Sequence, residues 1–118
     1  MIPLIHATGE GKQLNLNEYQ KLASRTANIK DEALTNFALG IAGEAGEVAD
    51  IVKKYVYHGH TLDREELINE LGDVLWYVSQ LAAWMDIELE EVAHKNIEKL
   101  LARYPNGFSK EASRSRAL

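Results

Sequence analysis

Apolar residues recur every three or four positions through most of this chain, with polar residues between them. This period places side chains on one face of an α-helix. It extends over residues 15–27, 31–57, 61–85 and 88–104, which we predict to be four helices. In the longest of them, the predicted apolar stripe is Leu34, Ala38, Ile41, Ala45, Val48, Val52 and Val56. The pattern therefore predicts an all-α fold with four main helices.

The ends of these segments carry residues that start or stop helices. Asparagine, aspartate and threonine side chains accept hydrogen bonds from the free N–H groups of a first helical turn. The candidate caps are Asn15 or Asn17 for the first helix, Asp31 for the second, and Thr61 or Asp63 for the third. Gly59 stops the second helix, and Pro105 follows the fourth. We divide the chain into an N-terminal arm (1–14), a helical domain (15–108) and a loosely held C-terminal tail (109–118).

Length and composition limit the kinds of protein that this chain can be. With 118 residues, it has room for one domain and one core. The absence of cysteine excludes disulfides and thiolate metal sites. No segment resembles a signal peptide or reaches the roughly 18 apolar residues of a membrane span, so we expect a cytoplasmic protein without membrane contact. A net charge of −5 argues against binding a nucleic acid polymer.

Two pairs of acidic residues stand out within the predicted helices. Glu44 and Glu47 lie three residues apart in the second helix, and Glu70 and Asp73 have the same spacing in the third. Residues three apart share a helix face, so packing of the two helices would gather four carboxylates. Like charges about 5 Å apart repel by roughly 3 kcal/mol at an effective dielectric near 20. A Mg²⁺ ion, which prefers carboxylate and phosphate oxygens, would remove this repulsion. The alternative is a solvated acidic surface.

Three glycines surround the first acidic pair. Gly40, Gly43 and Gly46 lie inside the predicted second helix, where each costs roughly 1 kcal/mol relative to alanine. Two explanations for them remain open at this point. One is the close approach of another helix, and the other is space for a metal-bound phosphate beside the backbone.

The motif EAGE, followed by a 22-residue interval and ELGD, resembles the ExxE…ExxD signature of the MazG-like nucleoside triphosphate pyrophosphohydrolases. The segments GEAGEVADIVKK, NELGDVLWYV and KNIEKLLARYPNGFS extend this similarity over residues 19–109. The resemblance implies a four-helix MazG-like bundle as the fold. The function that it implies is the removal of surplus or non-standard (d)NTPs. The implied reaction is a Mg²⁺-dependent hydrolysis between the α and β phosphates, giving a monophosphate and pyrophosphate. It also implies that Glu44, Glu47, Glu70 and Asp73 are the metal ligands. We expect Glu47 to have a second role, orienting or deprotonating the attacking water.

The phosphates of such a substrate need cations. The resemblance implies that basic residues of the fourth helix reach them, which makes Lys99 and Arg103 the best candidates and Asn96 their polar partner. A solvated helix face is the alternative for each of them. Lys54 lies seven residues after Glu47, on nearly the same helix face, and is another possible phosphate contact.

Aromatic residues and histidines are the remaining candidates. Tyr77 lies four residues after Asp73, so its ring or hydroxyl could contact the sugar or base. Phe37 is a further possible wall for the base. His58 and His60 form an HxH motif in the predicted turn, and we expect them to be solvated rather than to bind zinc, because no third soft ligand is evident.

Other functions and an oligomeric state also follow from the sequence. The predicted second and third helices carry apolar residues on more than one side, so a homodimer or homotetramer would bury the remainder. A second enzymatic possibility is phosphoribosyl-ATP pyrophosphohydrolase, which belongs to the same superfamily. A non-catalytic helical adaptor would not need the full set of four acids. Di-iron bundles use ExxH pairs, which this chain lacks.

Overall fold

The computed structural model describes residues 13–30 and 32–115. Within these ranges the chain is helical, and its only β-type pairing is an isolated bridge between Pro105 and Gly107. The elements in chain order are α2 (Leu16–Ala23), the 3₁₀ helix η1 (Ser24–Thr26), α3 (Ala33–His58), α4 (Arg64–Trp84), α5 (Leu89–Arg103) and α6 (Lys110–Arg114). The prediction of an all-α fold with four main helices is confirmed. None of the helices in the described ranges is both long enough and apolar enough to cross a membrane.

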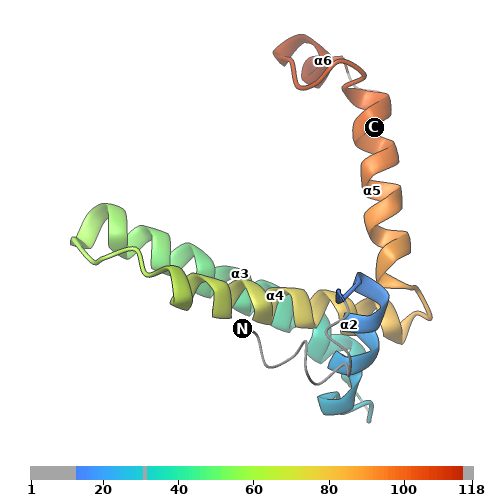
Figure 1. The fold of residues 1–118 in the computed structure, drawn as a ribbon. Coiled ribbons are helices and arrows are strands. Elements are labelled where there is room, and N and C mark those ends of the chain that lie inside the picture. The colour runs from blue at the N-terminus through green and yellow to red at the C-terminus, as the bar shows by residue number, and fades with distance from the viewer. Residues whose placement is uncertain (1–12, 31, 116–118) are drawn as a thin grey trace.

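Helices α3 and α4 form a long antiparallel hairpin that is the body of the chain (Figure 1). Helix α2 packs across the C-terminal half of α4. Helix α5 begins at this junction, then runs away from the hairpin and leads to α6 (Figure 1). The hairpin and α5 are therefore two arms that meet at one end.

Local side-chain chemistry explains where the helices begin. The Asn15 side chain accepts a hydrogen bond from Glu18 N at 2.8 Å, and the Glu18 carboxylate accepts one from Asn15 N at 3.3 Å. This capping box satisfies two N–H groups at once. Asp63 caps α4 by accepting from Glu65 N at 2.9 Å. Gly59, at a φ of 72°, ends α3 in the left-handed conformation that glycine adopts without strain.

The predicted boundaries differ from the observed ones in three places. The α-helical part of the first helix ends at Ala23, and a 3₁₀ turn completes the segment. The residue before α3 is Glu32, at a φ of 71° and without a side-chain cap bond, and the predicted cap Asp31 lies outside the described residues. The tail contains the short helix α6, which the sequence did not predict. Ser109 caps it by accepting a hydrogen bond from Ala112 N at 3.0 Å.

The junction of α2, α4 and α5 is organised around a buried amide. The Gln20 amide group donates to the backbone oxygens of Ser79 at 3.1 Å and Ile87 at 2.9 Å, and its oxygen accepts from Leu89 N at 2.9 Å. A buried polar side chain is tolerated when its hydrogen-bonding groups are used in this way. The buried apolar residues of the described chain are Ala33, Phe37, Ala82 and Leu89.

This core is thin because each side of the hairpin is covered only in part. Several members of the predicted α3 stripe are exposed, among them Leu34 (42%), Val52 (44%) and Val56 (58%). The sequence predicted the stripe, and the structure shows that these members of it are not covered within the described chain. On α4, Leu71 and Leu75 are also exposed, and Trp84 is exposed near its end. Helical period identifies an apolar face, but it does not say whether that face is covered by the same chain.

Candidate metal and phosphate site

A close contact between α3 and α4 fixes the spacing of the hairpin. A Cβ atom added at Gly40 would overlap the ring carbons of Tyr77, so glycine allows the ring to lie against the α3 backbone. Tyr77 also packs edge-on against Trp76, with ring centroids 5.0 Å apart. Of the two explanations for the glycines, close helix approach therefore accounts for Gly40. An added Cβ at Gly43 would meet no described atom within 4 Å.

One helical turn from this contact, the structure brings three acids together. Glu44 follows Gly40 by four residues on α3, and Asp73 precedes Tyr77 by four residues on α4. One carboxylate oxygen from each of Glu44, Glu70 and Asp73 lies within 4.8 Å of the others. The predicted gathering of carboxylates is thus observed for three of the four acids, and their binding of a metal stays a prediction.

The negative charges of these acids act on one another. The pKa of Glu70 is raised above its usual value, first by partial burial and then by a hydrogen bond with Glu44. The negative charges of Glu44, Asp73 and Glu47 raise it further. Lys53, Lys54 and Arg64 form ion pairs with Asp50 and Glu65 rather than with these acids. Carboxylates close enough to raise the pKa of Glu70 favour a cation between them.

The donor set fits a hard divalent cation. Magnesium binds oxygen ligands at 2.0–2.1 Å, so two opposite ligand oxygens of one ion lie about 4.2 Å apart. Oxygens that lie within 4.8 Å of one another are therefore close to the spacing of ligands around one ion. Glu44 and Glu70 are half-buried and Asp73 is exposed, which leaves one side of the cluster open to a ligand.

A cavity of about 290 Å³ adjoins the cluster, between the last turns of α3, the first turns of α4 and the loop that joins them. Its walls include Glu47 and Glu70, so the fourth predicted ligand borders the cavity together with a member of the cluster. Lys54, the predicted phosphate contact, also lines it. The other lining residues are Asp50, Ile51, His60, Thr61 and Glu66, which the sequence analysis did not assign to the site.

Comparisons with known proteins agree with this arrangement. The sequence profile of the MazG nucleotide pyrophosphohydrolase domain matches residues 32–108, which contain all four acids. The chain belongs to the MazG family. It is also 37% identical over 105 residues to the Gene 37 protein of Mycobacterium phage L5, an alignment that covers 80% of this chain and 92% of that protein. No solved structure gives a significant match.

Aromatic side chains near this MazG site have different roles. Phe37 is only 1% exposed and packs against Trp76 with ring centroids 5.9 Å apart, so it is part of the core rather than a wall open to a base. Tyr77 is half-buried against α3, and its predicted contact with a sugar or base stays a prediction. Tyr19, which the sequence analysis missed, lies near the cluster. Partial burial and the charge of Asp73 raise the pKa of its hydroxyl.

The predicted substrate-binding residues of α5 do not lie beside the acids of their own chain. Asn96 and Lys99 line a surface hollow of about 440 Å³ on α5, and Arg103 is the last residue of that helix. Lys99 and Arg103 belong to the C-terminal half of α5, which runs away from the hairpin, and Asn96 is its middle residue (Figure 1). Their contact with substrate stays a prediction, and within one chain Lys54 is the cation that the structure places next to the acids.

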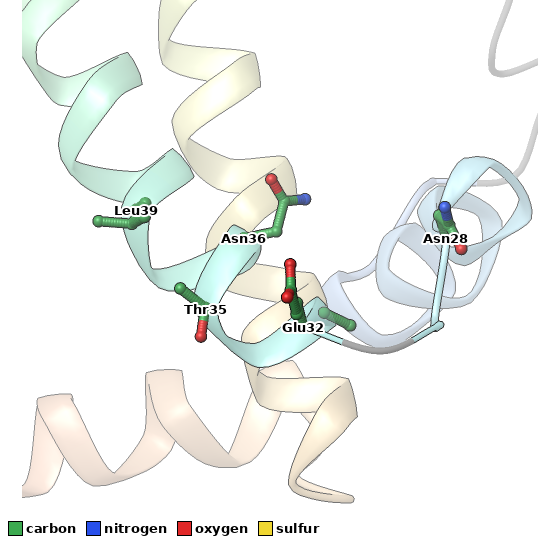
Figure 2. A pocket seen from close by; sticks show the side chains of 6 residues that line it. Asn28, Glu32, Thr35, Asn36 and Leu39 are labelled. Carbon is green, nitrogen blue, oxygen red and sulfur yellow. The ribbon is translucent and has the colours of Figure 1, made fainter.

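A larger hollow, of about 450 Å³, lies at the start of α3 and is unsuited to this chemistry. Asn28 comes from the segment before α3, and the other lining residues lie in the first turns of α3 and just before it (Figure 2). Glu32 is its charged lining residue, and none of the lining residues is basic. This hollow therefore offers no lysine or arginine to a phosphate.

Proposed function

We propose that this chain is a Mg²⁺-dependent nucleoside triphosphate pyrophosphohydrolase that cleaves (d)NTPs between the α and β phosphates. The products would be a nucleoside monophosphate and pyrophosphate. The observation that carries the proposal is the cluster of Glu44, Glu70 and Asp73, whose oxygens lie within 4.8 Å of one another in a chain of the MazG family. These acids would be costly to keep together for fold stability alone.

The residues of the site can be given distinct roles. Glu44, Glu70 and Asp73 would hold the ion, and Mg²⁺, when bound, supplies the positive charge that an acidic site needs to accept a triphosphate. Glu47 borders the cavity without belonging to the group of three, so its carboxylate is available to orient a water molecule and accept its proton. Lys54 lies on the same cavity wall and would contact the phosphates.

We also propose that the working form is a homodimer or homotetramer in which α5 of one chain supplies cations to the acids of another. Large apolar side chains are exposed on both arms, including Leu71 on α4 and Leu101 (62%) on α5. Because α5 leads Lys99 and Arg103 away from the hairpin (Figure 1), a second copy would bring such residues to the acids. Association of this kind covers apolar faces that a single chain leaves open.

Subunit complementation tests the shared site. Inactive Glu70→Gln chains are mixed with inactive Lys99→Ala chains under exchanging conditions. If sites are shared in a dimer, half of the mixture is heterodimer with one intact site of two, so about a quarter of wild-type activity returns. Failure to recover activity, despite exchange shown by labelled subunits, would assign α5 to the acids of its own chain.

The reaction itself is tested by pyrophosphate release from a panel of standard and damaged nucleoside triphosphates, with Mg²⁺ and with EDTA. We expect metal-dependent formation of monophosphate and pyrophosphate, and its loss in Glu47→Gln and Asp73→Asn with helicity unchanged in circular dichroism. Lys53→Gln is the control, because Lys53 is exposed and does not line the cavity. Release from phosphoribosyl-ATP alone would favour the histidine-pathway reaction, and no release from any of these would favour a non-catalytic adaptor.

A further inference from the structure

The wall of the cavity formed by α3 contains an ion pair that the ExxE…ExxD motif does not include. Asp50 Oδ2 lies 2.8 Å from Lys54 Nζ, and Asp50 Oδ1 lies 3.4 Å from Lys53 Nζ. Both Asp50 and Lys54 line the cavity, whereas Lys53 does not. One carboxylate therefore holds two lysines, of which only Lys54 borders the space next to the acids.

The positions along α3 explain this arrangement. Glu47, Asp50 and Lys54 are spaced i, i+3 and i+7, so they follow one face of the helix toward its C-terminal end. That face looks onto the first turns of α4, where Glu66 and Glu70 line the opposite wall. The cavity thus has acids on both walls and one lysine ammonium, which is fixed by a carboxylate on its own helix.

The charges around Lys54 show why its position needs fixing. The pKa of Lys54 is raised, first by its hydrogen bond to Asp50 and then by the charges of Asp50, Glu47 and Glu66. The lysine is thus fully charged at neutral pH. Without Asp50, the Lys54 side chain could turn toward Glu47 or Glu66, or out into solvent, because lysine has a flexible chain of four carbons.

We propose that Asp50 is a positioning residue that holds the Lys54 ammonium in this cavity, where it binds the terminal phosphates of the triphosphate and the pyrophosphate product. This inference rests on the proposed function, because it deepens the phosphate end of the same site. Asp50 itself does not touch the substrate, since a carboxylate and a phosphate repel each other. The nucleoside end of the substrate lies beyond the influence of this pair.

The test measures binding of magnesium pyrophosphate to the full-length protein by calorimetry, and inhibition of turnover by pyrophosphate and by nucleoside monophosphate. In Asp50→Asn, we expect about tenfold weaker pyrophosphate binding and an equal rise in KM, because a misplaced ammonium loses a charge-assisted contact. The kcat and the inhibition by monophosphate stay near wild-type values. Asp50→Glu keeps an i,i+4 pair with Lys54 and restores most of the binding. Lys53→Gln is the matched control and binds pyrophosphate like the wild type.

The outcomes separate this inference from the proposed function. If Asp50→Asn binds pyrophosphate as well as the wild type, or if Lys53→Gln is equally impaired, the positioning role is refuted. If Asp50→Asn weakens monophosphate inhibition as much as pyrophosphate inhibition, the effect is a general disturbance and the inference also fails. If the wild type releases no pyrophosphate from any triphosphate but binds magnesium pyrophosphate in an Asp50-dependent way, the proposed function fails and the positioning role stands.

Discussion

Replacing Gly40 with alanine tests whether its contact with Tyr77 sets the helix spacing at the site. Two effects oppose each other in this variant. Alanine in a helix interior is favoured over glycine by about 1 kcal/mol. Against this, the new Cβ would overlap three carbons of the Tyr77 ring, and overpacking of this kind costs roughly 1–3 kcal/mol. The ring is also held edge-on against Trp76, so we take about 3 kcal/mol for the cost. The expected net loss is about 2 kcal/mol in the free energy of unfolding.

Gly43→Ala is the matched control for this substitution. It lies on the same helix, three residues further along, and its added Cβ would meet no described atom within 4 Å. Only the helix propensity then changes, so we expect a gain of about 1 kcal/mol. Urea unfolding followed by circular dichroism, at one protein concentration and in EDTA, should place the two variants on opposite sides of the wild type.

The same variant also tests the link between helix spacing and the acids. Gly40 lies one turn before Glu44, and Tyr77 lies one turn after Asp73, so a wider gap at this contact would separate the ligand oxygens. We expect Gly40→Ala to need several times more Mg²⁺ for half-maximal activity. If Gly40→Ala is as stable as Gly43→Ala, the Tyr77 ring moves aside with no loss in the free energy of unfolding. The contact would then not set the helix spacing. If Gly40→Ala is unstable but keeps the Mg²⁺ requirement of the wild type, the contact serves the fold and not the metal site.

Three further predictions concern the acids and the first helix. At 100 times the dissociation constant, Mg²⁺ should stabilise the wild type by about 2.7 kcal/mol, and Glu70→Gln should lose most of this gain in thermal unfolding. In EDTA, wild-type stability relative to Glu70→Gln should increase as the pH falls from 7 toward 5. The raised pKa of Glu70 means that the folded state binds its proton more tightly, so this contribution is present at low pH and lost as the pH rises through the folded pKa. A difference that is flat with pH would show that neither partial burial nor the neighbouring acids raise the pKa of Glu70. Asn15→Ala removes the capping box of α2 and should cost about 1 kcal/mol in urea unfolding, whereas an unchanged midpoint would mean that the cap is dispensable.

The parts of the fold that depend on local chemistry were predictable from the sequence. The four main helices follow from the apolar period, and Asn15 and Asp63 cap them because a cap acts on backbone groups only two or three residues away. The acid cluster belongs to the same class. Its two halves lie on helices joined by a five-residue loop, so the hairpin brings Glu44 beside Glu70 with few alternatives.

Features that depend on which surfaces meet were not predictable in this way. The stripe containing Val52 and Val56 has the right period for burial, yet no element of the described chain covers those residues. Asp50, His60 and Thr61 line the cavity because of how the end of α3 meets the start of α4. In the sequence, Asp50 is explained as an ordinary i,i+4 ion-pair partner of Lys54 on a helix surface. Nothing in that spacing indicates a role in binding a ligand.

The proposed triphosphate site needs carboxylates for the metal and cations for the phosphates, and the chain supplies these two groups in different ways. The acids are fixed by one hairpin, which brings Glu44, Glu70 and Asp73 together within each chain. Most of the candidate cations lie on α5, which leaves the hairpin at the junction around Gln20 (Figure 1). A single chain would thus bind the metal with only Lys54 to meet the phosphates, whereas an assembled pair of chains would add Lys99 and Arg103. On this reasoning, metal binding should survive dilution to the monomer, while affinity for the triphosphate should fall with dissociation.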